Sequence, residues 1–341
     1  KTIVFVFFCL NFHISGFCQD FQWARQIKGI TYDYADFANG LAVDSNENTY
    51  TVGSTDSPLF DLDPTVTGTE IIDNTIINNS FRGTYLIKTD KDGNYLWGLT
   101  FALNKGNFNG NDTGFDVKIG SDGNIYVLLS LSELNTSLNI MDTFIKIIKI
   151  SPSGNIITST SIKQNYGFNN NMYVYSFDLD NQNNIFLSGW FVGNIAINNN
   201  PNLNINNANG IGNYLLKINN NGNFDWIKQF NIGDNSSNEV IVRPDGNANF
   251  LVKRFNDYVL YNIDNLNGSI IWQKDFINQT QRTFHVSNNG IVILGGKNYY
   301  DIIDVDPSLS VLNISGFNTS FIIFLNLNGD LIDVKQFEKP S

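Results

Sequence analysis

The sequence predicts an all-β fold in which four-stranded antiparallel sheets repeat along a chain of 341 residues. Three observations support this prediction. Two phrases of the form apolar strand, polar turn, apolar strand alternate along the chain, their turn glycines recur at intervals of tens of residues, and no segment after residue 20 has the apolar period of a helix. Repeats of four strands that stack side by side are typical of β-propeller blades.

The first phrase predicts a hairpin that opens each repeat. Its turns are rich in Asn, Asp and Gly, which favour tight hairpin turns, and the chain holds 54 asparagines in all. The five copies are "LAVDSNENTYTVG" (41–53), "FDVKIGSDGNIYVLL" (115–129), "SFDLDNQNNIFLSG" (176–189), "EVIVRPDGNANFLV" (239–252) and "TFHVSNNGIVILGG" (283–296).

The second phrase predicts a hairpin that closes each repeat. Stretches such as "YLI" and "IIF" are apolar on both faces, which indicates strands covered on each side by a neighbouring sheet. Its turn glycines are Gly93, Gly154, Gly222, Gly268 and Gly329. The predicted domain covers residues 19–341, with repeats at about 40–101, 114–162, 175–230, 238–276 and 282–337.

An early segment, "DFQWARQI" (20–27), matches the fourth strand of a repeat, because Trp23 falls where Trp97 does. In many propellers such a strand completes the last blade. The fifth repeat, however, already has its own fourth strand, "DLIDVKQF" (330–337). We therefore expect either that the early strand pairs with the edge of the fifth sheet, or that the natural chain continues past Ser341 with three strands of a further blade.

The first 18 residues predict a secretory signal peptide, with one basic residue and an apolar run over 3–10 that is too short to span a bilayer. We expect cleavage between Cys18 and Gln19, and export to the cell surface or the medium. The mature chain would then contain no cysteine and no disulfide. Lipidation of Cys18 is an alternative, although Phe17 stands where such signals carry a small residue.

The charge balance argues against two classes of partner. The chain has 32 acidic residues against 21 Lys and Arg, a formal net charge of −11 at pH 7. Such a surface repels phosphate backbones and anionic lipid headgroups. We expect no nucleic acid partner and no membrane span.

A resemblance to a known family rests on four stretches: "FQWARQIKG", "GLAVDSNENTYTVGS", "FDLDP" and "LIKTDKDGNYLW". They resemble the repeats of secreted SBBP-type β-propeller proteins of bacteria that use type IX secretion. The resemblance covers residues 20–337, is strong in the first and third repeats, and fades in the second and fourth. It implies an exported propeller and implies no shared catalytic residues.

Three tryptophans, Trp97, Trp226 and Trp272, each lie four residues after a turn glycine. An indole that recurs at one position of the repeat predicts a wedge between neighbouring sheets. A weaker resemblance, through Asp264, Gly268 and Trp272 at four-residue steps, is to tryptophan-docking propeller repeats. Trp190 lies outside the pattern and is the better candidate for an exposed aromatic side chain.

The search for chemistry names no catalytic, cofactor-binding or metal-binding residue, and we expect no cofactor. His285, on a strand with apolar neighbours, predicts a core or edge histidine. The polar segment 195–213 predicts a long loop at the rim. Three carboxylate pairs predict turn caps, with calcium binding as the alternative, which would need six or more oxygen ligands. These pairs are Asp61 with Asp63, Asp90 with Asp92, and Asp304 with Asp306.

Two hypotheses of function remain. The first is an exported, non-catalytic and monomeric module for binding, adhesion or scaffolding, with an extracellular protein or glycan as partner. The second is a hydrolase or lyase that acts on extracellular polysaccharide at the central channel, which would gather acids and a base on the first strands. Aliphatic residues on these strands favour the first hypothesis: Val43, Val117, Leu179, Val242 and Val286.

Overall fold

The computed structural model describes most of the chain after residue 23. The described residues are 24–29, 35–63, 65, 69–73, 83–101, 112–135, 137–138, 140–164, 170–197, 203–230, 238–255, 257–277, 280–297, 300, 302–308, 310, 312–316 and 319–337. The predicted signal peptide and Trp23 lie outside these ranges. No helix in the described ranges is long and apolar enough to cross a membrane.

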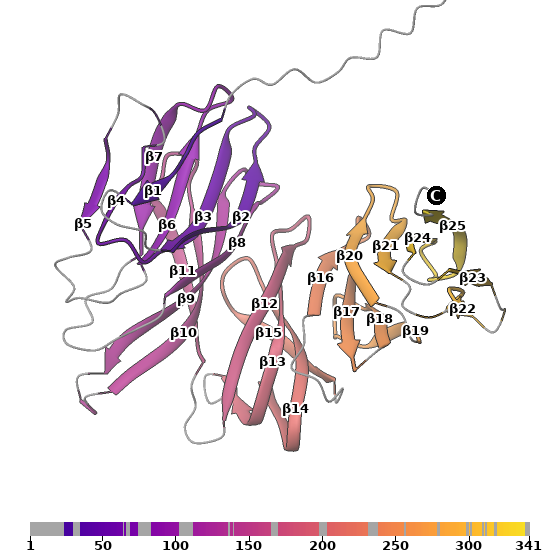
Figure 1. Cartoon of the computed structure of the whole chain (residues 1–341). Coiled ribbons are helices and arrows are strands. Elements are labelled where there is room, and N and C mark those ends of the chain that lie inside the picture. The colour runs from indigo at the N-terminus through magenta and orange to yellow at the C-terminus, as the bar shows by residue number, and fades with distance from the viewer. Residues whose placement is uncertain are drawn as a thin grey trace, which may run out of the picture.

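Five four-stranded antiparallel sheets follow one another along the chain and fan out in that order from β2 to β25 (Figure 1). The first sheet consists of β2 (Asp36–Val43), β3 (Thr49–Thr55), β6 (Gly83–Thr89) and β7 (Tyr95–Thr100), and the second of β8 (Thr113–Ile119), β9 (Ile125–Asn135), β10 (Ile140–Ile150) and β11 (Ile156–Lys163). The third consists of β12 (Asn171–Leu179), β13 (Ile185–Ala196), β14 (Asn204–Ile218) and β15 (Phe224–Phe230). The fourth consists of β16 (Asn238–Val242), β17 (Ala248–Arg254), β18 (Asp257–Ile263) and β19 (Ile270–Phe276), and the fifth of β20 (Thr280–Val286), β21 (Val292–Lys297), β24 (Ser320–Leu325) and β25 (Leu331–Phe337).

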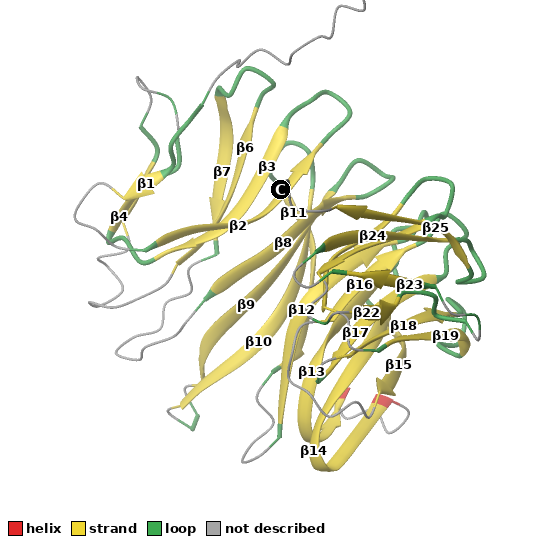
Figure 2. Ribbon diagram, turned by 45° about the vertical axis from the view of Figure 1, so that its right-hand side comes forward, coloured by secondary structure: helices red, strands yellow, loops and turns green. Residues whose placement is uncertain are grey.

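These sheets confirm the predicted fold class, because each of the five repeats forms one sheet whose strands pair in chain order. The ribbon view shows strands, turns and loops and almost no helix (Figure 2). Two short sheets are built from insertions between second and third strands, and one of them also includes a strand that precedes the first sheet. One pairs β1 (Lys28–Gly29), β4 (Leu59–Asp61) and β5 (Ile71–Asp73), and the other pairs β22 (Ile302–Asp304) with β23 (Asn313–Ser315).

The first strand of each sheet lies on the inner side of the fan. In succession, β2 contacts β8, β8 contacts β12, β12 contacts β16, and β16 contacts β20. Each pair of neighbouring sheets encloses an apolar cluster of buried side chains. The prediction that third strands are covered on both faces is confirmed for β6, in which every residue is buried, but not for β24, in which buried and less buried residues alternate. Sheet-on-sheet burial is therefore what stabilises the stack.

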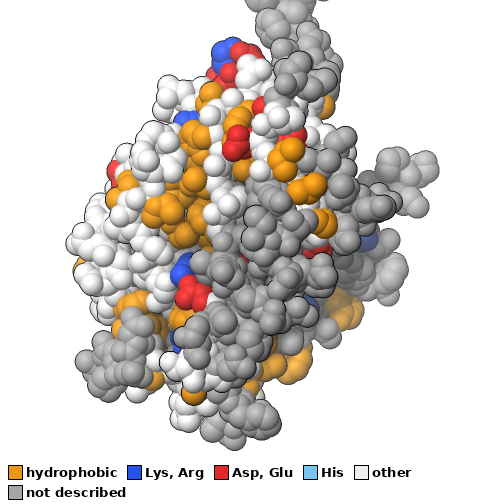
Figure 3. All heavy atoms as spheres, turned by 90° about the vertical axis from the view of Figure 1, so that its left-hand side faces the viewer, with side chains coloured by type: hydrophobic (Ala, Val, Ile, Leu, Met, Phe, Trp, Pro, Cys, Tyr) orange, Lys and Arg blue, Asp and Glu red, His pale blue; other side chains and the backbone are white. Residues whose placement is uncertain are grey.

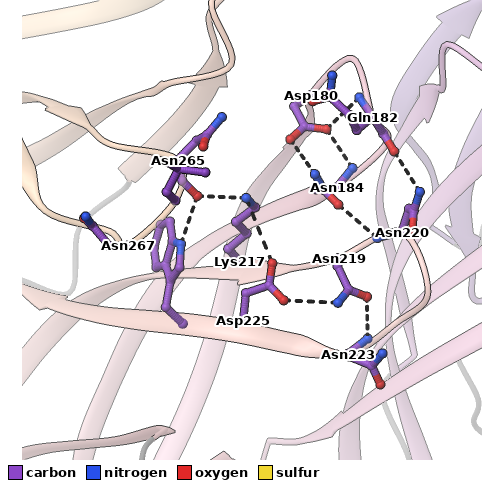
Figure 4. A network of polar contacts seen from close by, with 12 residues as sticks. Asp180, Gln182, Asn184, Lys217, Asn219, Asn220, Asn223, Asp225, Asn265 and Asn267 are labelled. Carbon is purple, nitrogen blue, oxygen red and sulfur yellow. Dashed lines mark hydrogen bonds and ion pairs between the residues drawn. The ribbon is translucent and has the colours of Figure 1, made fainter.

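Side chains in cross-strand register form a row on the face of each sheet that meets the next sheet. In the third sheet this row is Asp178, Phe186, Lys217 and Trp226, one residue from each strand. The indole N–H of Trp226 and the ammonium of Lys217 both donate to the backbone carbonyl of Asn265, at 3.1 and 2.8 Å. Asn265 lies in a turn of the fourth sheet, so this contact joins two sheets (Figure 4).

The same contact recurs at two other boundaries. Trp97 and Lys88 donate to the carbonyl of Pro152 in the second sheet, at 3.1 and 3.0 Å. Trp272 donates to the carbonyl of Leu327 in the fifth sheet at 3.1 Å. In the fourth sheet Asn262 occupies the position that Lys88 and Lys217 have in the other two sheets. The second donor to the Leu327 carbonyl is instead the guanidinium of Arg243, from the inner turn, at 2.9 Å. The predicted role of the three tryptophans as wedges is confirmed.

Two segments differ from the prediction. Most of 195–213 is strand rather than rim loop: β13 and β14 extend outward as a ladder that pairs Ile195 with Ile205. Alternate apolar residues of this extension, including Ile195, Ile197 and Leu203, are buried and make it part of the core. The sequence pattern was hidden by the many asparagines between them.

The early segment also differs. Residues 24–27 form no strand, and β1 pairs with β4 of the first sheet's insertion rather than with β25. The Arg25 side chain donates to the carbonyl of Gly93 at 3.3 Å, and the Gly29 N–H donates to Asp36 at 2.9 Å. Local partners in the first sheet therefore hold this segment, and the fifth sheet keeps β25 as its last strand.

A pair of glycine variants separates the indole contact from backbone strain. Gly268 and Gly123 have φ values of 71° and 73°, in the left-handed region that costs an L-residue about 1 kcal/mol. A Cβ on Gly268 would lie 2.8 Å from the Trp226 ring, whereas Gly123 has open space around it. We expect Gly268→Ala to lower the free energy of unfolding by about 3 kcal/mol and Gly123→Ala by about 1 kcal/mol, measured by urea denaturation. Equal losses of unfolding free energy in the two variants would show that the indole contact does not require a glycine at position 268.

Candidate functional site

Four charged side chains gather on the inner strands of three sheets. Asp116 and Lys118 lie on β8, Asp178 on β12 and Glu239 on β16. We call them the inner-strand cluster. Asp116 and Lys118 alternate with Val117, whose side chain is buried toward the first sheet, so the two charged side chains lie on the opposite face of the strand.

Hydrogen bonds position the carboxylates of the cluster. The Lys118 ammonium lies 3.4 Å from a carboxylate oxygen of Asp116, and the other Asp116 oxygen accepts the Val117 N–H at 2.8 Å. Asp178 accepts the Val242 N–H of the next sheet at 2.7 Å. Because that N–H lies on an inner strand, Asp178 bridges two neighbouring sheets at their narrow side. Gly40 allows β8 to approach closely, since a Cβ there would lie 2.7 Å from the Asp116 Cα.

Desolvation by the surrounding protein raises the pKa of all three carboxyl groups, although Asp116 and Asp178 are half-buried and Glu239 is exposed. For Asp116, burial outweighs the opposing effect of the neighbouring Lys118. For Asp178, burial raises the pKa, Lys118 lowers it and the charge of Asp116 raises it further. Glu239 is exposed to solvent, yet the surrounding protein raises its pKa, with Lys118 opposing and the Asp116 and Asp178 charges adding. Three carboxyl groups thus share a single cation in a partly desolvated place.

An open cavity of about 330 Å³ adjoins the cluster at the turn ends of the inner strands. Val242 connects the cavity to the cluster, because it lines the cavity and its N–H donates a hydrogen bond to Asp178. Arg243, also in the lining, is held by Leu327 and by an ion pair of 3.0 Å with Asp245. The lining residues are Leu179, Asp180, Asn181, Val242, Arg243, Pro244, Val286, Ser287 and Asn288.

Four of the five aliphatic residues that favoured a scaffold pack on the preceding sheet, and three of these four, Leu179, Val242 and Val286, also line the cavity. Val117 and Val286 are buried, and Leu179 and Val242 pack on the apolar clusters between sheets. Only Val43 among them is mostly exposed, at 56%. The inference drawn from them is wrong, because it used the face of each strand that packs on the preceding sheet. The alternation of charged and apolar residues in "DVK" at 116–118 is the sequence signal that could have indicated charged side chains on the opposite face of the strand.

Two of the predicted carboxylate pairs cap their own insertions in the same way. Asp61 accepts the N–H groups of Asp63 and Glu70, at 3.0 and 2.9 Å. Asp304 likewise accepts the N–H groups of Asp306 and Leu312, at 3.0 and 2.9 Å. The prediction of turn caps is confirmed for these residues.

The third pair also lies in a turn. Asp90 accepts the N–H groups of Asp92 and Asn94, and Asp92 pairs with Lys91 at 3.0 Å. Hydrogen bonds from Asn94 lower the pKa of Asp90. Across the described ranges, no three His, Cys, Asp or Glu side chains are grouped so that they could hold a metal ion.

The remaining candidates lie away from the cluster or at its margin. His285 is exposed on the inner strand β20, so it is an edge histidine and the core alternative is wrong. Trp190 is half-buried and stacks on Tyr173, with ring centroids 4.0 Å apart and planes 13° apart. Much of the indole that we expected to be exposed is therefore covered by a tyrosine of the adjacent strand.

Comparison with known proteins identifies the class. Residues 22–60 match the family model described as a beta-propeller repeat, SBBP. Residues 22–60 therefore match one beta-propeller repeat, and the five stacked four-stranded antiparallel sheets have the architecture of propeller blades. The resemblance to SBBP repeats stated from the sequence is confirmed over these residues. No curated protein matches the chain.

Solved structures show only limited similarity. The Dos1 propeller has 10% identity and a TM-score of 0.42, over 90% of this chain and 86% of that chain. A quinonprotein alcohol dehydrogenase-like protein from Bacteroides thetaiotaomicron has 9% identity and a TM-score of 0.25, over 90% of this chain and 97% of that chain. Similarities of this size say nothing about ligand or chemistry.

A substitution at Asp178 tests the electrostatics of the cluster. Because the folded-state pKa is raised, the Asp178 charge opposes folding at neutral pH, and this effect disappears as the pH falls toward the ordinary value of 3.8. Asp178→Asn keeps an acceptor for the Val242 N–H and removes the charge. We expect its melting temperature at pH 7 to rise by about 2 °C, and the gain to vanish near pH 4.

The matched control is Asp90→Asn, where the pKa is lowered in the folded state. This substitution should reduce stability at pH 7, with the loss fading as the pH falls below 3.8. Thermal melts followed by circular dichroism, from pH 7 down to well below pH 3.8, measure both variants. A loss of stability in Asp178→Asn at pH 7 would show that its charge, rather than its hydrogen bond, stabilises the stack.

Proposed function

We propose that this β-propeller repeat protein is an exported, non-catalytic binding module. Its partner is an extracellular protein or glycan that binds at the inner-strand cluster and the adjoining cavity. The single observation that carries the proposal is the convergence of Asp116, Lys118, Asp178 and Glu239 from three sheets. Carboxyl groups whose pKa is raised by desolvation and by like charges cluster at functional sites.

The chemistry of the cluster suits a ligand rich in hydroxyl or ammonium groups. Ionised carboxylates accept hydrogen bonds, and Lys118 donates them, so a sugar or a lysine-bearing loop would find complementary groups. Export is supported by the residues that predict a signal peptide, with cleavage before Gln19. Binding modules on rigid β scaffolds commonly place such groups where sheets meet.

A second candidate function is hydrolysis or elimination on an extracellular polysaccharide. It is favoured by the raised pKa of Asp116, Asp178 and Glu239, because a raised pKa moves a carboxyl group toward the range in which general acids work.

Glu239→Gln tests the site of binding. We expect a glycan array and a panel of extracellular matrix proteins to yield a ligand that raises the melting temperature of the exported protein. Affinity for that ligand, measured by calorimetry, should fall about tenfold in Glu239→Gln, which corresponds to one lost charge-assisted hydrogen bond of about 1.4 kcal/mol.

The control is Asp92→Asn, which removes one exposed charge far from the cluster in sequence and should leave affinity unchanged. Undiminished binding by Glu239→Gln would contradict the proposed site. Release of shortened or unsaturated sugars on incubation with polysaccharide, lost in Glu239→Gln or Asp178→Asn, would establish the second candidate function.

The proposed export predicts the residue at which the mature protein begins. The protein recovered from the surface or medium of an expressing bacterium should begin at Gln19, as read by mass spectrometry of its first peptide. A mature chain that begins at a lipidated Cys18 would show instead that the exported protein is anchored to a membrane by its lipid. A protein that retains residues 1–18 in the cytoplasm would contradict export.

A further inference from the structure

Apolar and polar side chains are not strictly divided between the surface and the interior of this protein. Apolar side chains gather at the surface on the side of the first sheet (Figure 3). Conversely, polar side chains lie buried between the fourth and fifth sheets, among them Arg243, Asn249 and Asn262. A buried polar side chain needs a partner, because water no longer surrounds it.

The cross-strand row of the fourth sheet differs from the rows of the first three sheets. In those sheets the second strand contributes an aromatic ring and the third strand a lysine, whose ammonium lies 5.0 to 5.5 Å from the ring centroid. The fourth sheet places Asn249 and Asn262 at these two positions, paired across β17 and β18. Two short amides thus replace a large ring and a long cation. The pairs in the first three sheets are Tyr50 with Lys88, Tyr126 with Lys149, and Phe186 with Lys217.

Both asparagines are buried in apolar surroundings. Asn249 is 0% exposed and Asn262 is 1% exposed. The residues that flank them in the row, Ile241 and Trp272, pack on the apolar cluster between the fourth and fifth sheets. The two amides therefore face a side of the fifth sheet that is built of apolar side chains.

A buried guanidinium lies on the same face of the fourth sheet. Arg243 follows Ile241 by two residues, so its side chain emerges on the face that carries the row. Only 3% of this side chain is exposed. One of its terminal nitrogens donates to the Leu327 carbonyl and the other pairs with Asp245. Burial lowers the pKa of Arg243, and the Asp245 charge opposes this effect.

Four polar atoms of these three side chains have no hydrogen-bond partner among the residues that the structure describes: Asn249 Nδ2 and Oδ1, Asn262 Oδ1 and Arg243 Nε. Two of these atoms donate hydrogen bonds and two accept them. Both ends of the Asn249 amide are among them, so turning this amide over does not pair it. Buried polar groups in native proteins are nearly always bonded to the protein or to ordered water.

The spacing of the two sheets leaves room at these positions. The Trp272 indole donates to the Leu327 carbonyl at 3.1 Å, the same length as the corresponding contacts of Trp97 and Trp226. The fourth and fifth sheets are thus held by the same contact as other neighbouring sheets, although smaller side chains lie in the row between them. A molecule of the size of water fits where an asparagine stands in place of an aromatic ring.

We propose that Asn249, Asn262 and Arg243 form an internal binding site for ordered water, which bridges the two amides and the guanidinium. Water satisfies all four atoms, because each molecule both donates and accepts hydrogen bonds. A small anion only accepts, so it leaves the oxygens of Asn249 and Asn262 unpaired. This site lies inside the stack and does not depend on the proposed function. Arg243 also lines the open cavity, which is therefore the side from which water enters.

A variant of nearly the same shape tests whether the Asn249 amide is hydrated. Leucine has the size and branching of asparagine but no polar group. If water bonds this amide, Asn249→Leu breaks the bridge and leaves the Arg243 Nε–H unpaired. We therefore expect its melting temperature to fall by about 3 °C. Leucine would instead relieve a dry, unpaired amide, so a melting temperature that rises or stays the same would overturn the proposal. The control is Asn46→Leu at an exposed turn residue, with a change of less than about 1 °C.

A crystal structure at a resolution that shows ordered water provides the second readout. We expect density within hydrogen-bond distance of Arg243 Nε and of both asparagine side chains, and we expect this density to be lost in Asn249→Leu. Crystals soaked in bromide should give no anomalous signal there. A bromide peak would identify an anion site, and two amides bonded directly to each other without density beside Arg243 Nε would mean that no water is bound. Either result would overturn the proposal.

Discussion

The stack depends on one contact, in which a tryptophan of one sheet docks on a turn of the next. The indole covers the turn glycine, and its N–H donates to a turn carbonyl, at the boundaries that Trp97, Trp226 and Trp272 occupy. Neighbouring sheets diverge toward the outside, and the indole is the side chain large enough to fill the outer gap.

Because the tryptophans fill the outer gap between neighbouring sheets, they also set how closely the inner strands approach one another. Once the sheets are held at the outside, their first strands come close, and Gly40 and Asp178 mark two such approaches. Charged residues from different sheets are thereby brought into one region. Carboxyl groups whose charge opposes folding remain there, which fits a site maintained for binding rather than for stability.

Much of the fold could be predicted because its signals are local. Turn asparagines and glycines mark hairpins, and a tryptophan at a repeated position marks a sheet boundary. The extension at 195–213 was missed, because Ile195, Ile197, Leu203 and Ile205 alternate within a polar, Pro-containing stretch that looks like a loop. Residues 24–27 were expected to be part of a strand and are not, because a tryptophan pattern says which strand type a segment resembles and not which edge it meets.

By itself, the sequence determined the number of sheets, their strand order, the turn chemistry and the tryptophan wedges, since each follows from residues close together in the chain. Only the tertiary structure decided which face of each inner strand packs and which carries the cluster. Alternation along a strand defines two faces but does not say which neighbour covers each one.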